Sequence, residues 1–132
     1  MSSNDEITRL DVTVHTVGTT AVVSARGEVD MLTVPRLGAG IEQALASTQT
    51  ALIVDLSDVT FLASIGMAAL VTAHRTAGET VTTLVVADGP HTRRPMQLVG
   101  LDSILTIYPD LATALATLTQ IPTTDEPLDP VA

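Results

Sequence analysis

The chain contains no cysteine, no tryptophan and no lysine, and its only aromatic residues are Phe61 and Tyr108. Without cysteine there can be no disulfide, no thiol catalysis and no Cys-based metal site. Since aromatic side chains are so scarce, the core must be built from Val, Leu, Ala and Ile. Small aliphatic side chains of this kind suit a thin sheet covered by helices.

Positive charge is also scarce, because six arginines stand against 15 Asp and Glu residues and the net charge is −9. Nucleic acids and anionic membranes bind through clustered Lys and Arg, and Arg93-Arg94 is the only adjacent basic pair. We therefore expect no nucleic-acid and no membrane partner. A neutral or basic protein partner fits this charge better.

Long apolar runs are absent as well, since no segment reaches the roughly 18–20 residues that a membrane-spanning helix needs. The first residues, up to Arg9, are polar and carry Asp5 and Glu6 where a secretory leader would be positive. We expect a soluble cytoplasmic protein. Length and composition predict one domain over 8–119, a disordered N-terminus at 1–7, and a disordered acidic, Pro-rich tail at 120–132.

What is present is an alternation of strand and helix patterns. A half-buried strand begins at Leu10, and the Gly18-Thr19-Thr20 turn links it to a second strand in an antiparallel hairpin. Thr33 is a helix N-cap candidate with Pro35 in the first turn. The remaining predictions are strands at 51–54, 83–87 and 104–108, helices at 65–77 and 93–99, and helical stripes at 37–45 and 111–118.

The predicted order is β-β-α-β-α-β-α-β-α. Strands that alternate with helices favour a mostly parallel sheet with right-handed crossovers, and the opening hairpin makes that sheet mixed. The fold class is therefore α/β, a single domain with about five strands and four helices.

The most informative segment is 55–70, where a buried strand is expected to end at about Asp55 and a helix to begin at Ser64 after a loop. In open α/β sheets, sites gather at the carboxyl ends of strands. Ser64 is placed as an N-cap, which is a common structural role for serine. The same place also favours an anion, so a phosphate on Ser64 is a second reading. Asp55 and Asp58 are interpreted mainly as turn formers.

Three motifs give a resemblance to a known family. Asp55-Leu56-Ser57 followed by Ser64-Ile65-Gly66 is similar to the signature of STAS-domain anti-sigma-factor antagonists. Gly27-Glu28-Val29-Asp30 resembles the Gly-Glu-Leu-Asp that follows the second strand of that family, and 98–102 resembles its Leu-x-Gly-Leu-Asp. The resemblance runs from about residue 8 to 119.

The resemblance implies a STAS-like fold and a switch without catalytic residues. The unphosphorylated form would bind an anti-sigma factor with serine-kinase activity and so release the sigma factor. Phosphorylation of Ser64 would end binding, and a serine phosphatase would restore it. This chain departs from the family pattern because Ala63 replaces the usual Asp and Ile65 replaces Ser or Thr. The expected partner-binding residues are Asp30, Ala63, Ser64, Ile65, Met67 and Ala68.

Other functions fit the sequence less well. A phosphoaspartate receiver needs a lysine that this chain lacks. A hydrolase with Ser64 as nucleophile needs a base, for which His15, His74 and His91 are the candidates. No Gly-x-Ser-x-Gly elbow motif surrounds Ser64, and the histidines do not have metal-ligand spacing. A STAS scaffold or ligand-sensing module that is not phosphorylated stays open. We expect no cofactor and no metal.

Overall fold

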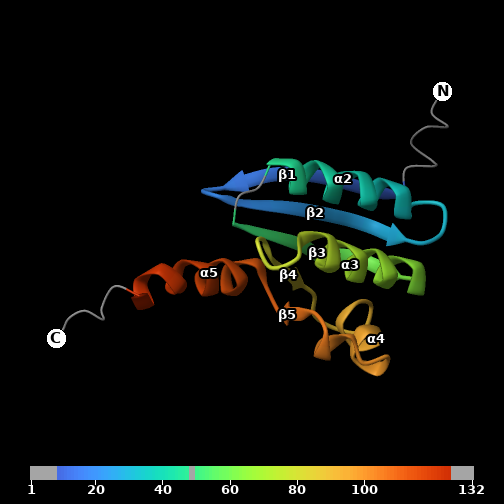
Figure 1. The fold of residues 1–132 in the computed structure, drawn as a ribbon. Coiled ribbons are helices and arrows are strands. Elements are labelled where there is room, and N and C mark those ends of the chain that lie inside the picture. Colours follow the sequence, from blue (N-terminus) through green and yellow to red (C-terminus); the bar gives the residue numbers. More distant parts are fainter. Residues whose placement is uncertain (1–8, 48–49, 126–132) are drawn as a thin grey trace.

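The computed structural model describes residues 9–47 and 50–125 (Figure 1). Within these ranges the chain forms a five-stranded sheet whose spatial order is β1-β2-β3-β4-β5. The strands are β1 (Leu10–Val17), β2 (Thr20–Val29), β3 (Ala51–Leu62), β4 (Thr82–Val86) and β5 (Thr106–Tyr108). Only the β1–β2 pair is antiparallel, so the predicted mixed, mostly parallel sheet is confirmed.

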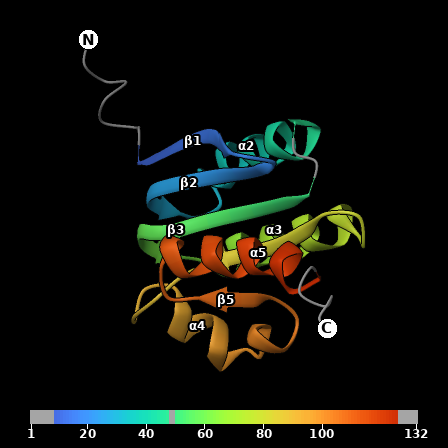
Figure 2. The ribbon, with the colours of Figure 1, turned by 90° about the vertical axis from the view of Figure 1, so that its left-hand side faces the viewer.

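Helices cover both faces of this sheet (Figures 1 and 2). Helices α2 and α3 lie on one face, and α5 lies on the opposite face across the last three strands. The α-helices are α2 (Val34–Ser47), α3 (Ser64–Ala77), α4 (Arg93–Leu98) and α5 (Leu111–Asp125). The predicted order of strands and helices is confirmed throughout the described residues, with a short 3-10 turn, η1 (Leu101–Ser103), added after α4.

The hairpin follows from the sequence directly. Val17 pairs with Thr20, and Gly18 takes a φ of 62° between them, where glycine has no side chain to clash. Along β1, Val12 and Val14 pack toward α2, whereas the alternate polar residues are exposed. The two-residue period predicted for this strand is therefore the observed one.

The core has two parts because the sheet has two covered faces. The larger part lies between the sheet and α2 and α3, and it includes Leu37, Leu52 and Leu70. The smaller part lies under α5, where Ala114 is fully buried against Val22 and Ile53. Removing apolar surface from water stabilises the fold by about 25 cal/mol per Å², and this burial is the main contribution that holds the layers together.

One prediction about β3 was wrong. A loop was expected after Asp55, but the strand continues to Leu62 and stays paired with β2. Its register shifts twice, because Ser24 pairs with Asp55 while Arg26 pairs with Asp58, and Gly27 pairs with Val59 while Glu28 pairs with Phe61. β4 pairs only with the first part of β3, up to Asp55. Irregularities of this kind let a strand bend while it keeps its partner.

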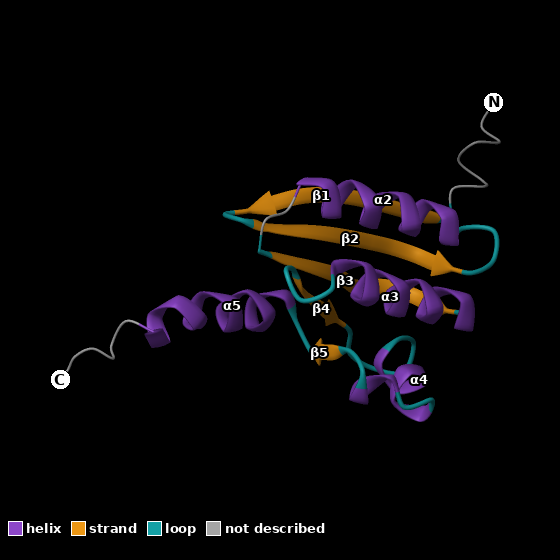
Figure 3. Cartoon of the chain, in the orientation of Figure 1, coloured by secondary structure: helices purple, strands orange, loops and turns teal. Residues whose placement is uncertain are grey.

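The segment between β4 and α5 is built from short elements joined by loops, namely α4, η1 and β5 (Figure 3). Gly100 takes a left-handed φ of 82° and ends the turn after α4. α5 runs to Asp125 and so passes residue 119, where the domain was expected to end. The predicted loose segment 1–7 and the rest of the predicted tail, 126–132, lie outside the described residues. No helix in the described ranges is both long and apolar enough to cross a bilayer.

Candidate functional site

The start of α3 differs from its prediction by one residue. Ala63, in extended conformation, is the N-cap, and Ser64 is the first helical residue. The prediction that the Ser64 hydroxyl caps the helix was therefore wrong, and among the described residues no side chain caps this end. Ser64 is exposed, so its hydroxyl is open to solvent at the carboxyl end of the sheet.

The backbone fixes this entry point from two sides. The Ala63 N–H donates to the carbonyl of Val29 at 2.9 Å, and the Ala63 carbonyl accepts from the N–H groups of Gly66 and Met67. Gly66 is buried so tightly that a Cβ there would lie 2.6 Å from Val29 Cγ1 and 2.7 Å from a Leu62 methyl. The glycine of the Ser64-Ile65-Gly66 motif thus lets the first turn of α3 rest on the ends of β2 and β3.

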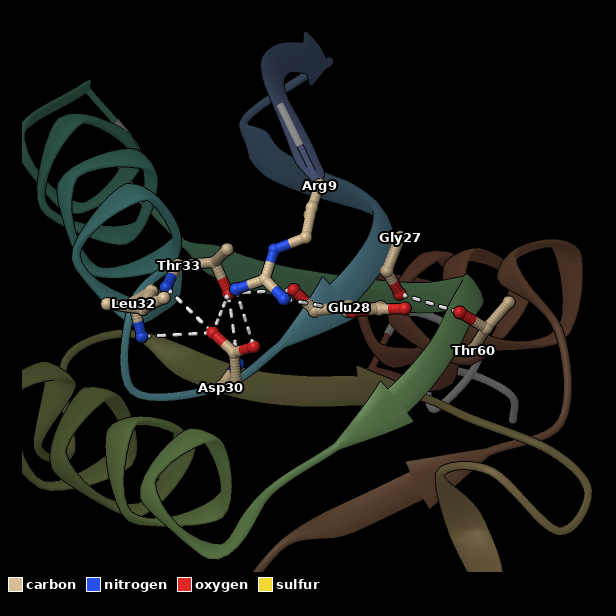
Figure 4. Close-up of polar contacts among 7 residues, drawn as sticks. All are labelled: Arg9, Gly27, Glu28, Asp30, Leu32, Thr33 and Thr60. Carbon is tan, nitrogen blue, oxygen red and sulfur yellow. Dashed lines mark hydrogen bonds and ion pairs between the residues drawn. The ribbon is translucent and has the colours of Figure 1, made fainter. Parts of the chain in front are cut away.

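The neighbouring junction between β2 and α2 is a closed hydrogen-bond network (Figure 4). Asp30 Oδ1 accepts the N–H groups of Leu32 and Thr33 at 2.9 and 3.0 Å. The Thr33 hydroxyl accepts the Asp30 N–H and lies 2.7 Å from the Glu28 carbonyl, to which it donates. Thr33 precedes α2 as predicted, but its hydroxyl holds the turn before the helix.

Arg9 ties the beginning of β1 to this junction. Its Nη2 lies 2.9 Å from Asp30 Oδ2, and its Nη1 lies 3.5 Å from Glu28 Oε1. The Arg9 carbonyl accepts the Glu28 N–H at 2.8 Å. A Cβ at Gly27, where φ is 118°, would come within 2.0 Å of that same carbonyl oxygen. Each residue of the Gly27–Asp30 motif therefore has a definite structural role, and Asp30 organises the turn between β2 and α2.

The ionisation of Asp30 follows from these contacts. Partial burial is the largest single influence and by itself raises the pKa of the carboxyl. The N–H groups of Thr33 and Leu32, the Thr33 hydroxyl and the Arg9 charge all favour the ionised form, and together they hold the pKa below its ordinary value. Asp30 is therefore ionised in the folded protein and paired with Arg9.

Asp55 and Asp58 lie farther back along β3. Asp55 Oδ1 accepts the Ser57 N–H at 2.9 Å and the Ser57 hydroxyl. These local bonds lie at the first irregularity of β3, but the strand continues through Asp55 and Asp58, so the prediction that these residues form a turn after the strand was wrong. Asp58 is exposed and pairs in register with Arg26 on the face that carries α5. It lines a shallow cavity there with Asp11, Thr13 and Ser24.

Large apolar side chains are exposed in the segments that lead into α2 and α3 and at the start of α3. Met31 and Leu32 are 73% and 78% exposed in the turn before α2, Phe61 is 51% exposed near the end of β3, and Ile65 is 42% exposed in α3. We call these four residues the apolar rim. Of the predicted partner-binding residues, Ile65 and Ala68 are exposed, and Met67 is half-buried and packs on the core.

Sequence reasoning missed Arg9, Met31, Leu32 and Phe61 as parts of this region. Met31-Leu32 carried a signal, because two large apolar residues inside a polar turn break the usual pattern of loops. Arg9 gave none, since its partners lie 19 and 21 residues away (28 − 9 and 30 − 9).

Two of the three histidines that the hydrolase alternative could use lie away from Ser64. His74 lies in the last turn of α3, at the other end of the helix from Ser64, and His15 pairs with Val22 near the hairpin. His91 is exposed in the segment between β4 and α4. Across residues 9–47 and 50–125, no group of three or more His, Asp or Glu side chains could hold a metal ion. The arrangement offers an exposed serine and exposed apolar side chains.

The geometry and the motifs define a class of protein. A family model described as "Mlab, STAS domain" matches residues 12–107, and the chain belongs to this STAS-domain family. Among its relatives is the anti-sigma-F factor antagonist RsfB of Mycobacterium tuberculosis. The two are 41% identical over 115 residues, which is 87% of this chain and 92% of RsfB.

Solved structures agree with the fold. The crystal structure of an anti-sigma factor antagonist from Mycobacterium paratuberculosis superposes with a TM-score of 0.78 and is 40% identical, covering 82% of this chain and 92% of that one. Unphosphorylated SpoIIAA, an anti-sigma factor antagonist, gives a TM-score of 0.67 at 22% identity, covering 84% and 98% of the two chains. The second likeness supports the fold alone.

Proposed function

We propose that this protein is an anti-sigma-factor antagonist without catalytic activity of its own, and that it acts in the cytoplasm. The observation that carries the proposal is that Ser64 is exposed on the first turn of α3, and that the exposed side chains of the apolar rim lie at the start of α3 and in the segments that lead into α2 and α3. The 41% identity to RsfB, whose name describes an antagonist of anti-sigma-F factor, supports the same reading. The partner would be an anti-sigma factor that covers the rim.

The finer proposal is a phosphorylation switch at Ser64. The partner would be a serine kinase that transfers a phosphoryl group from ATP to the Ser64 oxygen, and a serine phosphatase would hydrolyse the ester. The hydroxyl stands on the first turn of α3, where backbone N–H groups and the helix dipole favour an anion, so the fold tolerates the phosphate. Its added charge of about −1.5 to −2 would be desolvated against the partner.

Two neighbours of Ser64 would strengthen this effect. Ile65 and Phe61 are exposed apolar groups that contact a partner best in a dry interface, and a phosphate would bring water to them. A misplaced interfacial charge costs on the order of 2–5 kcal/mol, which is enough to end binding.

A direct test uses the whole chain, ATP and candidate serine-kinase anti-sigma factors, followed by peptide mass spectrometry. We expect phosphate on Ser64, loss of binding after modification, and no modification of Ser64→Ala. Ser103→Ala is the matched control, because Ser103 is an exposed serine that hydrogen-bonds the Gly100 carbonyl away from the rim. Phosphate on another serine, or binding unchanged by the modification, would contradict the switch.

The docking part of the proposal is tested separately. Leu32→Ser and Phe61→Ser should each weaken binding to the unmodified protein by about tenfold or more, as expected when a well-packed apolar contact is lost. Leu98→Ser is the control, since Leu98 is 72% exposed on α4, outside the rim.

A phosphorylation-independent scaffold is the second candidate, favoured by Ala63 and Ile65 at the two positions that flank Ser64. In that case Ser64→Glu would bind as well as the unchanged protein, while Leu32→Ser would still weaken binding. This combination of results separates a scaffold from a switch.

A further inference from the structure

The two edges of the sheet are protected very differently. β5 ends one side with only three residues, which is a common way to limit pairing with other chains. β1 ends the other side with eight residues and contains neither lysine nor proline, the residues that usually protect an edge. In the described part of the chain no strand lies beyond β1, which is outermost in both ribbon views (Figures 1 and 2).

The hydrogen bonds between β1 and β2 show which backbone groups of β1 point away from β2. The Glu28 N–H donates to the Arg9 carbonyl, so residue 9 belongs to the set that bonds toward β2. Hydrogen-bonded and non-hydrogen-bonded positions alternate along an antiparallel pair, so odd-numbered residues of β1 face β2. Leu10, Val12, Val14 and Thr16 therefore direct their N–H and C=O groups away from the sheet. Arg36 Nη1 lies 3.3 Å from the Leu10 carbonyl, as expected of an outward group.

We propose that this edge binds a second copy of the chain through antiparallel pairing of β1 with β1, which joins the two sheets. Two-fold symmetry requires that the partners' residue numbers have a constant sum, and hydrogen bonding requires that even residues pair with even ones. Centring the pair on Thr13 satisfies both conditions. Val12 then exchanges hydrogen bonds with Val14 of the second copy, and symmetry repeats that exchange; Leu10 takes no part, because it is fully buried and its carbonyl accepts from Arg36.

This register also brings together a carboxylate and an imidazole, which can hydrogen-bond. It places Asp11 opposite His15 of the second copy, and symmetry repeats that pair. Both side chains are exposed on the face opposite α2, so they are free to meet. Asp11 and His15 come together at non-hydrogen-bonded positions, where side chains of neighbouring strands approach most closely. Shifting the register by two residues in either direction separates Asp11 from His15.

The other face of the edge offers apolar surface. Val12 and Val14 are only half-buried, and they line a cavity of about 300 Å³ with Ala39, Gly40 and Gln43 of α2. In the symmetric pair, both α2 helices lie on the same side of the joined sheet and enclose these valines. Gly40 keeps α2 close to β1, since a Cβ there would lie 2.6 Å from Val12 Cγ1.

Pairing at this edge is independent of the proposed switch. β2 separates β1 from β3 and α3, so Ser64 and the apolar rim lie outside the proposed contact. A contact between two single strands is smaller than a standard protein interface, so the dimer should be weak.

The test is sedimentation velocity on the full chain, up to about 1 mM protein, where a weak interface still associates. We expect the unchanged protein to dimerise reversibly. His15→Asp places like charges opposite one another twice and should weaken association about tenfold. The exchanged double variant Asp11→His with His15→Asp should restore it to within about threefold, because the proposed register pairs these two positions.

Amide hydrogen exchange gives an independent reading of the register. The amides of Val12 and Val14 should become protected only as the protein concentration rises, whereas those of Thr13 and His15 should be protected at all concentrations. Circular dichroism of each variant checks that it is folded. A monomer at every concentration, a dimer insensitive to His15→Asp, or protection of Val12 and Val14 that does not depend on concentration would overturn the proposal.

Discussion

Two helices begin side by side at the carboxyl end of the sheet, and they begin in opposite ways. The entry to α2 is closed, because Asp30 and Thr33 use their side chains to satisfy the backbone of the turn, and Arg9 neutralises the carboxylate. The entry to α3 is open, because Ala63 supplies no cap among the described residues and Ser64 is exposed. The comparison indicates that the hydrogen bonds of the β2–α2 junction make this end of the sheet rigid, while the Ser64 hydroxyl is not used to cap α3.

The largest effect is expected when the closed junction is forced apart. Gly27→Ala places a Cβ 2.0 Å from the Arg9 carbonyl oxygen at a φ of 118°. We expect the free energy of unfolding to fall by about 3 kcal/mol or more, since both a backbone clash and an unfavourable φ are created. Urea unfolding measures this loss of free energy. Gly38→Ala is the control, because a Cβ there meets nothing within 4 Å, and it should stabilise α2 slightly.

A pH-dependent effect is expected from Asp30→Asn. The pKa of Asp30 is lowered in the folded state, so its charge stabilises the fold above the unfolded-state pKa of about 3.9. That contribution is lost as the pH falls through the lower, folded-state pKa. The urea midpoint of the unchanged protein should therefore exceed that of the variant at pH 7 and approach it below about pH 4. A difference that stays constant with pH would contradict the role of this charge.

The open entry can be closed by Ala63→Asp. Ala63 already has the extended conformation of an N-cap, and an aspartate there can accept a first-turn N–H. We expect a gain of about 1 kcal/mol in the free energy of unfolding. Ala68→Asp, an exposed site inside the same helix, should give no gain. If Ala63→Asp is also neutral, the start of α3 has another partner for its N–H groups.

The smallest effect is expected from Ser64→Ala. Since Ser64 follows the cap and is exposed, removing its hydroxyl should change the free energy of unfolding by less than about 0.5 kcal/mol. Partner regulation should nevertheless be lost. A loss near 1 kcal/mol would mean that the hydroxyl caps the helix after all.

Local patterns were enough for much of the molecule. The two-residue alternation of β1, the glycine turn at Gly18 and the apolar stripe of α2 depend on neighbours in the chain, and each was predicted correctly. The extension of β3 beyond Asp55 was not predictable in the same way. Residues 56–62 look like a loop because polar residues interrupt them, and their pairing with β2 holds them extended.

The sequence by itself determined the order of the elements, the α/β class and the position of Ser64 near the start of a helix, because periodicity and turn residues act over short distances. The tertiary structure decided which residue caps α3, which arginine holds Asp30 and which apolar side chains stay exposed. Those outcomes depend on contacts between segments far apart in the chain, and packing chooses among alternatives that local propensity leaves equal.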